Sequence, residues 1–166
     1  MKLSAQEEYG LRCLLFMAKK GAGESLSIPE ISRAEGLSIP NVAKLMRLLR
    51  LGGFVQSARG QAGGYTLSRS PEQITVASVM ELLGGTFFGP HFCERHSGVE
   101  RTCAHTSDCA IRCLWSKINL MLQEVLGHTS LQDLLASEQD LAGRIARQNG
   151  HCAEVVSNPE LATFHS

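Results

Sequence analysis

Residues 27–53, SIPEISRAEGLSIPNVAKLMRLLRLGG, predict two short helices joined by a turn at Gly36. Ser27 and Glu30 have the spacing of a capping box, in which each side chain bonds the backbone N–H of the other. Ser38 precedes the second helix, and each helix has a proline in its first turn, where the missing N–H is harmless. Two helices that cross at a wide angle need a small residue at the turn, which Gly36 supplies. The stretch therefore favours a helix-turn-helix.

A two-stranded ribbon with a glycine-rich tip is predicted directly after this stretch. Residues 54–57 and 64–68 have the composition of short strands, and the link between them, ARGQAG, has the chemistry of a turn. A helix-turn-helix followed by a hairpin is the order of a winged helix-turn-helix domain, which we assign to residues 1–85. The fold class is thus mainly α. The other helices expected in this domain span residues 5–20 and 76–83.

The net charge is zero, but the basic residues gather in the first half of the chain. Residues 1–75 carry ten Lys or Arg and six Asp or Glu, whereas residues 76–166 carry six and ten. A basic segment indicates a surface for a polyanion, although a solvated helix face has the same composition. A winged helix-turn-helix presents the start of its second helix to the major groove of double-stranded DNA. The residues expected to contact DNA are Ser38, Asn41 and Lys44 on that helix and Arg59 in the wing.

The composition also excludes several classes of protein. No run of about 20 apolar residues would span a membrane, and the start, MKLSAQEEYG, lacks the apolar segment of a secretory signal. We therefore expect a soluble cytoplasmic protein, in which cysteines are metal ligands or redox groups rather than disulfides. Two cysteines are not expected to be ligands. Cys13 lies in the apolar stripe of a predicted helix and should be buried, and Cys152 lies near the end of the chain. No Cys–His–Asp order predicts an enzyme, so no catalytic residue is expected.

Four of the six cysteines lie in residues 93–113, CERHSGVERTCAHTSDCAIRC. The paired Cys-x-x-Cys knuckles typical of structural zinc sites are absent. Iron–sulfur clusters are held by cysteine thiolates, because iron and sulfide prefer soft donors. Segment 86–109 is polar, so we expect a cofactor rather than a core to organise it. The histidines His91, His96 and His105 keep a zinc site open as an alternative, and the cysteines keep a thiol/disulfide switch open.

A long helix is predicted from Ala110, with apolar residues at a/d-like spacing over about two heptads. This seam favours a homodimer, which suits a DNA-binding module that reads two half-sites. Packing within the chain is the alternative. We assign residues 110–148 to the dimerisation helix and C-terminal helices, and residues 149–166 to a flexible tail. The seam residues are Ile111, Leu114, Trp115, Ile118, Met121, Leu122 and Val125.

Three stretches resemble the Rrf2 family of winged helix-turn-helix transcription regulators. They are MKLSAQEEYGLRCL, ARGQAGGYTLSRS, and the cysteine segment followed by Leu114-Trp115, and the resemblance covers about residues 1–135. It implies a DNA-binding dimer in which many members hold a 2Fe–2S or 4Fe–4S cluster between the fourth helix and the long helix. The three cysteine ligands implied by the resemblance are Cys93, Cys103 and Cys109.

The fourth ligand is the point at which this sequence departs from IscR-like members of that family. Those members place a histidine three residues after the third cysteine, where this chain has Arg112, which stays protonated and binds no metal. Other members use an acidic residue from the first helix of the partner subunit, and Glu8 matches that position. Cys113, one helical turn after Cys109, is the competing candidate, and a histidine, water or another small ligand is the remaining alternative.

The function expected from these features is regulation of transcription. The affinity for operator DNA would be controlled by an iron–sulfur cluster that senses iron, redox state or nitric oxide. The alternative is a winged-helix repressor that uses its cysteine segment as a zinc site or a thiol/disulfide switch.

Overall fold

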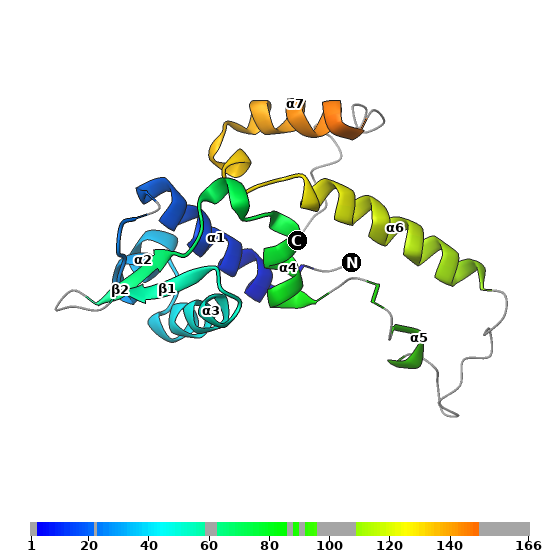
Figure 1. Ribbon diagram of the computed structural model, residues 1–166. Coiled ribbons are helices and arrows are strands. Elements are labelled where there is room, and N and C mark those ends of the chain that lie inside the picture. Colours follow the sequence, from blue (N-terminus) through cyan, green and yellow to red (C-terminus); the bar gives the residue numbers. More distant parts are fainter. Residues whose placement is uncertain are drawn as a thin grey trace.

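The structure is a computed structural model that describes residues 3–21, 23–58, 63–85, 88–89, 92–95 and 109–149. Its first part contains α1 (Ala5–Lys20), α2 (Ile28–Glu35), α3 (Ile39–Leu51), β1 (Val55–Ala58), β2 (Gly64–Leu67), a 3₁₀ turn η1 (Pro71–Gln73) and α4 (Val76–Gly84). Its second part contains α5 (Phe92–Arg95), α6 (Ala110–Gly127), a 3₁₀ turn η2 (Asp133–Leu135) and α7 (Glu138–Asn149) (Figure 1). No helix in these ranges combines the length and the apolar character that a membrane crossing requires.

The predicted winged helix-turn-helix is confirmed, and so is its local chemistry. The Glu7 carboxylate accepts a hydrogen bond from the Ser4 N–H at 2.8 Å, and the Ser4 hydroxyl accepts one from the Glu7 N–H at 3.3 Å. Ser27 and Glu30 repeat this exchange at the start of α2. Gly36 has φ 66° and ψ 27°, a left-handed conformation that ends α2 and turns the chain toward α3.

The core of this domain forms where α1 meets α2, α3 and α4. Gly10 lets α1 approach α4 closely, because a side chain at this position would collide with Leu83. Cys13, on the same helix, is buried as predicted. Helix α3 contributes four fully buried side chains to this core, Val42, Leu45, Met46 and Leu49.

The wing is a short antiparallel hairpin. Val55 pairs with Leu67 at its base, and strand β1 ends opposite Gly64. Leu26, just before α2, exchanges backbone hydrogen bonds with Tyr65 at 2.9 and 2.8 Å. The hairpin is therefore tied to the start of the helix-turn-helix, and its tip, residues 59–62, lies outside the described residues.

Helix α6 begins far from the winged-helix domain and runs back toward it, so that its last residue, Gly127, lies beside that domain (Figure 1). No side chain of α6 is buried in this chain. The seam packs within the chain only in part, because its exposed members are Ile111, Leu114 and Met121 and its half-buried members are Trp115, Ile118, Leu122 and Val125. After α6, Leu131 enters the core with 1% of its surface exposed. Its N–H donates to the Ile74 carbonyl at 2.8 Å, and the Val76 N–H donates to the Thr129 carbonyl at 2.8 Å. The end of α6 is thereby fixed to the segment that leads into α4.

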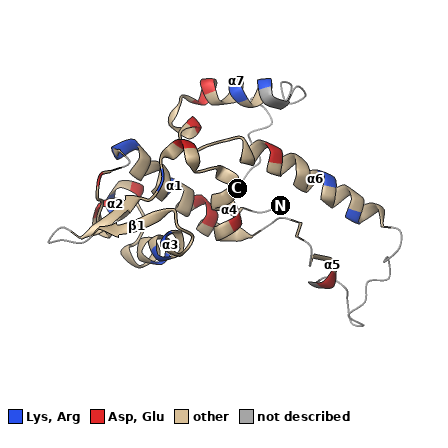
Figure 2. Cartoon of the chain, viewed as in Figure 1, with Lys and Arg blue, Asp and Glu red and all other residues tan. Residues whose placement is uncertain are grey.

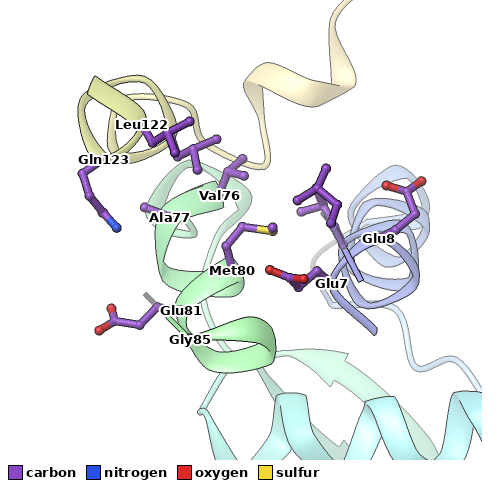
Figure 3. Close-up of a pocket in the computed structure, with 12 residues that line it drawn as sticks. Glu7, Glu8, Val76, Ala77, Met80, Glu81, Gly85, Leu122 and Gln123 are labelled. Carbon is purple, nitrogen blue, oxygen red and sulfur yellow. The ribbon is translucent and has the colours of Figure 1, made fainter. Parts of the chain in front are cut away.

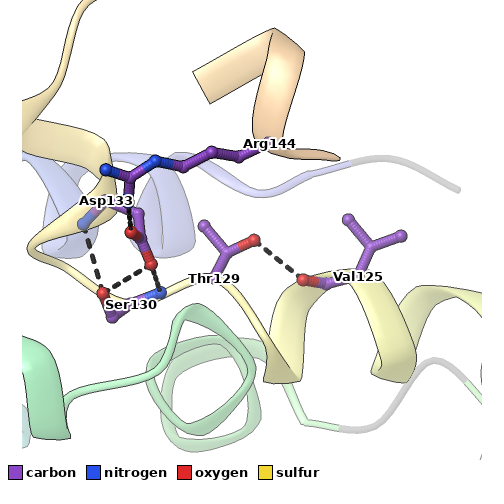
Figure 4. Close-up of polar contacts among 5 residues, drawn as sticks. All are labelled: Val125, Thr129, Ser130, Asp133 and Arg144. Carbon is purple, nitrogen blue, oxygen red and sulfur yellow. Dashed lines mark hydrogen bonds and ion pairs between the residues drawn. The ribbon is translucent and has the colours of Figure 1, made fainter. Parts of the chain in front are cut away.

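Three local features differ from what the neighbouring sequence alone suggests. Ser38 stands at the N-cap of α3, but its side chain makes no capping hydrogen bond. Ser130 and Asp133 exchange hydrogen bonds as at a helix start, yet only the 3₁₀ turn η2 follows, and Asp133 also pairs with Arg144 of α7 (Figure 4). Helix α5 was not predicted, since four residues are too few to show a helical period.

Candidate functional site

The outward face of α3 is the candidate DNA-binding surface. The structure places Ser38, Asn41 and Lys44 in or just before the first two turns of this helix. Ser38 and Lys44 are exposed and Asn41 is half-buried, while the core side chains point the other way. The three residues thus share the end of α3 that a helix-turn-helix presents to a major groove. Arg59, the fourth predicted contact, lies outside the described residues.

The charges around α3 suit an anionic partner. Arg47 and Arg50 are exposed on the same helix as Lys44, and the helix carries no acidic residue (Figure 2). Helix N-termini and exposed basic side chains both attract phosphate groups. Arg69 also contacts its own domain, because its guanidinium lies 5.1 Å from the centroid of the Phe54 ring. That contact stabilises the start of the wing.

Helix α5 and the start of α6, which carry two of the predicted cysteine ligands, lie at the end of the molecule opposite the wing (Figure 1). Cys93 lies in α5 and Cys109 is the N-cap of α6, and both are half-buried. The sulfur of Cys109 accepts a hydrogen bond from the Arg112 N–H at 3.3 Å. A helix N-terminus stabilises negative charge, so this position suits a thiolate ligand. Cys103 lies outside the described residues.

A hollow between α5 and α6 has Cys93 in its wall. Arg112 and Ser116 of α6 line the same hollow. The Phe88 N–H donates to the Asn119 side-chain oxygen at 3.4 Å, across 31 residues of sequence. This contact brings the chain that precedes α5 against α6. No local sequence pattern indicates such a contact, so the hollow could not be predicted from the sequence.

Within one chain, Glu8 is not grouped with the cysteines. It is exposed in the first turn of α1, at the edge of a groove between α1, α4 and the second half of α6 (Figure 3). Among the described residues, no three His, Cys, Asp or Glu side chains form a group that could hold a metal ion. The described part of one chain therefore does not assemble a complete ligand set.

The groove beside Glu8 is mainly apolar. Leu11, Met80, Leu122 and Leu126 line it, and Glu8 and Glu81 lie on opposite sides of it (Figure 3). This groove could not be predicted from the sequence, because three helices distant in sequence build it. Helix α6 adds further apolar surface through four side chains that are each more than half exposed, Ile111, Leu114, Leu120 and Met121.

The remaining described cysteines differ in accessibility. Cys113 is exposed one turn after Cys109, and its N–H donates to the Cys109 carbonyl at 3.1 Å. Cys13 is fully buried. Burial, followed by the negative charge of Glu35, raises the pKa of the Cys13 thiol to about 12, against a smaller opposite effect of Arg12. Cys13 therefore stays a neutral thiol and is unsuited to bind metal.

Comparisons with known proteins agree on one family. A sequence profile of the Rrf2 family, described as "Iron-dependent Transcriptional regulator", matches residues 3–137. The transcriptional regulator IscR of Cereibacter sphaeroides is 31% identical over 83% of this chain and 89% of its own length. The structure of CymR, the global cysteine regulator of B. subtilis, matches with a TM-score of 0.65 and 32% identity over 81% of this chain and 95% of CymR. The structure of IscR from T. potens matches with a TM-score of 0.65 and 27% identity over 81% of this chain and 86% of that one.

Proposed function

This chain belongs to the Rrf2 family of transcriptional regulators, and from that premise we propose that an iron–sulfur cluster held between α4 and α6 controls its affinity for operator DNA. Members of the family are DNA-binding regulators and not enzymes, so this chain is a DNA-binding regulator of transcription. The cluster, its ligands and its control of DNA binding are the proposal. We propose that this regulator acts in the cytoplasm, because its DNA target lies there.

The observation that carries the proposal is the position of Cys109. This residue is a candidate ligand and is also the N-cap of α6, where a backbone N–H already donates to its sulfur. Cys93 precedes residues 96–108 in the sequence, and it lines the hollow beside α6 together with Arg112. Cys93, Cys103 and Cys109 would hold the cluster, and soft thiolates suit iron. The family description, iron-dependent, and the similarity to IscR are consistent with this donor set.

An iron–sulfur cluster is a cofactor that would be gained, lost or oxidised in response to iron, oxygen or nitric oxide. Ligation by Cys93 and Cys109 would tie α5 to the first turn of α6, and loss of ligation would release it. Because α6 is continuous and Leu131 fixes its far end in the winged-helix core, a change at Cys109 would be felt by the DNA-binding domain.

A homodimer is the second part of the proposal. The exposed apolar side chains of α6 and the apolar groove beside α4 are the surfaces that a second copy would cover. Twofold pairing along α6 would set the distance between two α3 helices, which must match half-sites about 34–36 Å apart. A dimer would also give Glu8 a route to the site of the partner subunit. We propose Glu8 of the partner subunit as the fourth ligand, with Cys113 as the competitor.

A cysteine-based switch without a cluster is the alternative function. It is favoured by the exposure of Cys113 one turn after Cys109, and by a similarity to CymR as close as that to IscR. In this case the segment would bind zinc or form a disulfide instead of holding iron and sulfide.

Analysis of protein purified without oxygen separates the two. The cluster proposal predicts brown protein, absorbance beyond about 300 nm, and iron with acid-labile sulfide. Cys103→Ala is expected to remove the colour, whereas Cys13→Ala, which changes a buried thiol, is expected to keep it. Colourless protein that contains zinc, or that gains a disulfide on mild oxidation, would support the alternative and contradict the cluster.

A further inference from the structure

Helix α3 carries an aliphatic side chain at the end that faces DNA. Ile39 is the first residue of the helix and 54% of it is exposed. Pro40, beside it, is exposed, and Ala43 lies one turn further along the same side. The predicted polar contacts Asn41 and Lys44 lie on other sides of the same two helical turns. A single exposed aliphatic residue is ordinary on a protein surface, but Ile39 stands at the end of α3 that a helix-turn-helix places in the groove.

The major groove offers one apolar group for such a side chain to contact. Thymine presents its C5 methyl group there, whereas the other groups on the base edges are hydrogen-bond donors and acceptors. The side chain of Ile39 donates and accepts no hydrogen bond, and it cannot pair with a phosphate. We propose that Ile39 contacts the methyl group of a thymine in each operator half-site and so determines part of the sequence preference. This inference rests on the DNA-binding role assigned to α3 and is independent of the cluster.

The opposite end of the same helix provides a matched comparison. Leu51, the last residue of α3, is 69% exposed. It is as apolar as Ile39, but a helix-turn-helix places the first residues of its second helix in the groove and not the last. If Ile39 contacts thymine specifically, its substitution should change DNA binding and that of Leu51 should not. If exposed aliphatic residues only bind DNA non-specifically, both substitutions should have the same effect.

The test uses the full-length protein and duplexes that it selects from a pool of random sequence. Each thymine of a selected duplex is replaced in turn by deoxyuridine, which lacks the methyl group but keeps every hydrogen-bonding group. At one or two positions per half-site, the wild-type protein is expected to bind roughly three- to fivefold more weakly, the scale of burying one methyl group. Ile39→Ala should bind the thymine and uracil duplexes equally at those positions. Leu51→Ala and Ile39→Val should keep the discrimination.

Two results overturn the inference, and they are distinguishable. If wild-type protein binds every uracil duplex as tightly as thymine duplex, or if Ile39→Ala keeps the discrimination, Ile39 does not contact a thymine methyl although DNA binding stands. If the protein selects no duplex at all, the DNA-binding role of α3 fails and the inference fails with it.

Discussion

The backbone N–H of Leu131 donates to the carbonyl of Ile74 at 2.8 Å, and both side chains are fully buried in the winged-helix core. Leu131 follows α6, and Ile74 precedes α4. The helix proposed to hold the dimer together and the winged-helix domain are therefore joined where these two segments pack together, and the Val76–Thr129 hydrogen bond lies beside this contact. Packed interiors do not deform continuously. A movement of α6 would therefore shift the packed residues of the winged-helix core.

Leu131→Ala is expected to lower the free energy of unfolding by about 2–5 kcal/mol, because it removes a fully buried leucine and leaves a cavity. Urea denaturation measures this loss. Leu51→Ala, at an exposed leucine of α3, should change stability by less than about 0.5 kcal/mol. Equal stability of the two variants would show that Leu131 does not anchor α6 to the core.

Leu114→Glu is expected to weaken the homodimer, because it places a charge in the exposed apolar face of α6. Sedimentation analysis over a range of protein concentrations should show dimer for the wild type and a larger fraction of monomer for the variant. Lys117→Ala, an exposed change on the same helix, serves as the control and should stay dimeric. A wild-type protein that remains monomeric would contradict the proposed use of α6.

Cys13 predicts a loss of stability at alkaline pH. Its pKa in the folded protein is about 12 and the unperturbed value is 9.0, so the neutral thiol contributes fully below about pH 9. As the pH rises above 9 toward 12, the unfolded chain loses its proton first, and the contribution falls by about 1.4 kcal/mol per pH unit. Urea unfolding of wild type and Cys13→Ala at a series of pH values isolates this effect. Parallel pH profiles for the two proteins would show that Cys13 is not held as a buried thiol.

Mixed dimers identify the fourth ligand. If Glu8 acts in the partner subunit, a dimer of one Glu8→Ala subunit and one Cys109→Ala subunit keeps one complete site, because intact Glu8 and intact Cys109 meet across the dimer. Both homodimers of the variants should hold no cluster, and the mixed dimer should hold one. If Cys113 of the same chain is the ligand, Glu8→Ala homodimers stay loaded and Cys113→Ala homodimers do not. Iron and sulfide per dimer give the answer.

The local parts of the fold could be predicted from the sequence because short-range chemistry determines them. Ser4 with Glu7 and Ser27 with Glu30 begin helices through contacts three residues apart. Gly36 ends α2 through a conformation that glycine adopts easily. The alternating buried and exposed positions of α3 separate the core side from the side proposed to face DNA.

The parts that the sequence did not predict depend on contacts between distant segments. Leu131 lies in a short polar stretch, and only the return of the chain to Ile74 makes it a core residue. The hollow beside Cys93 and the groove beside Glu8 each need helices that no periodicity places side by side. A site shared by two subunits is still harder to predict from the sequence, because one chain alone does not complete it.

The measurement that tests the central claim most directly is the affinity for one selected operator duplex, at fixed salt, before and after the cofactor is removed. Fluorescence anisotropy should show a difference of roughly 5–150-fold between loaded and stripped wild-type protein, the usual range of coupling between two sites. Cys93→Ala should bind with one affinity under both treatments, equal to that of the stripped wild type. Equal affinities of loaded and stripped wild-type protein would contradict control by a cluster while leaving DNA binding intact.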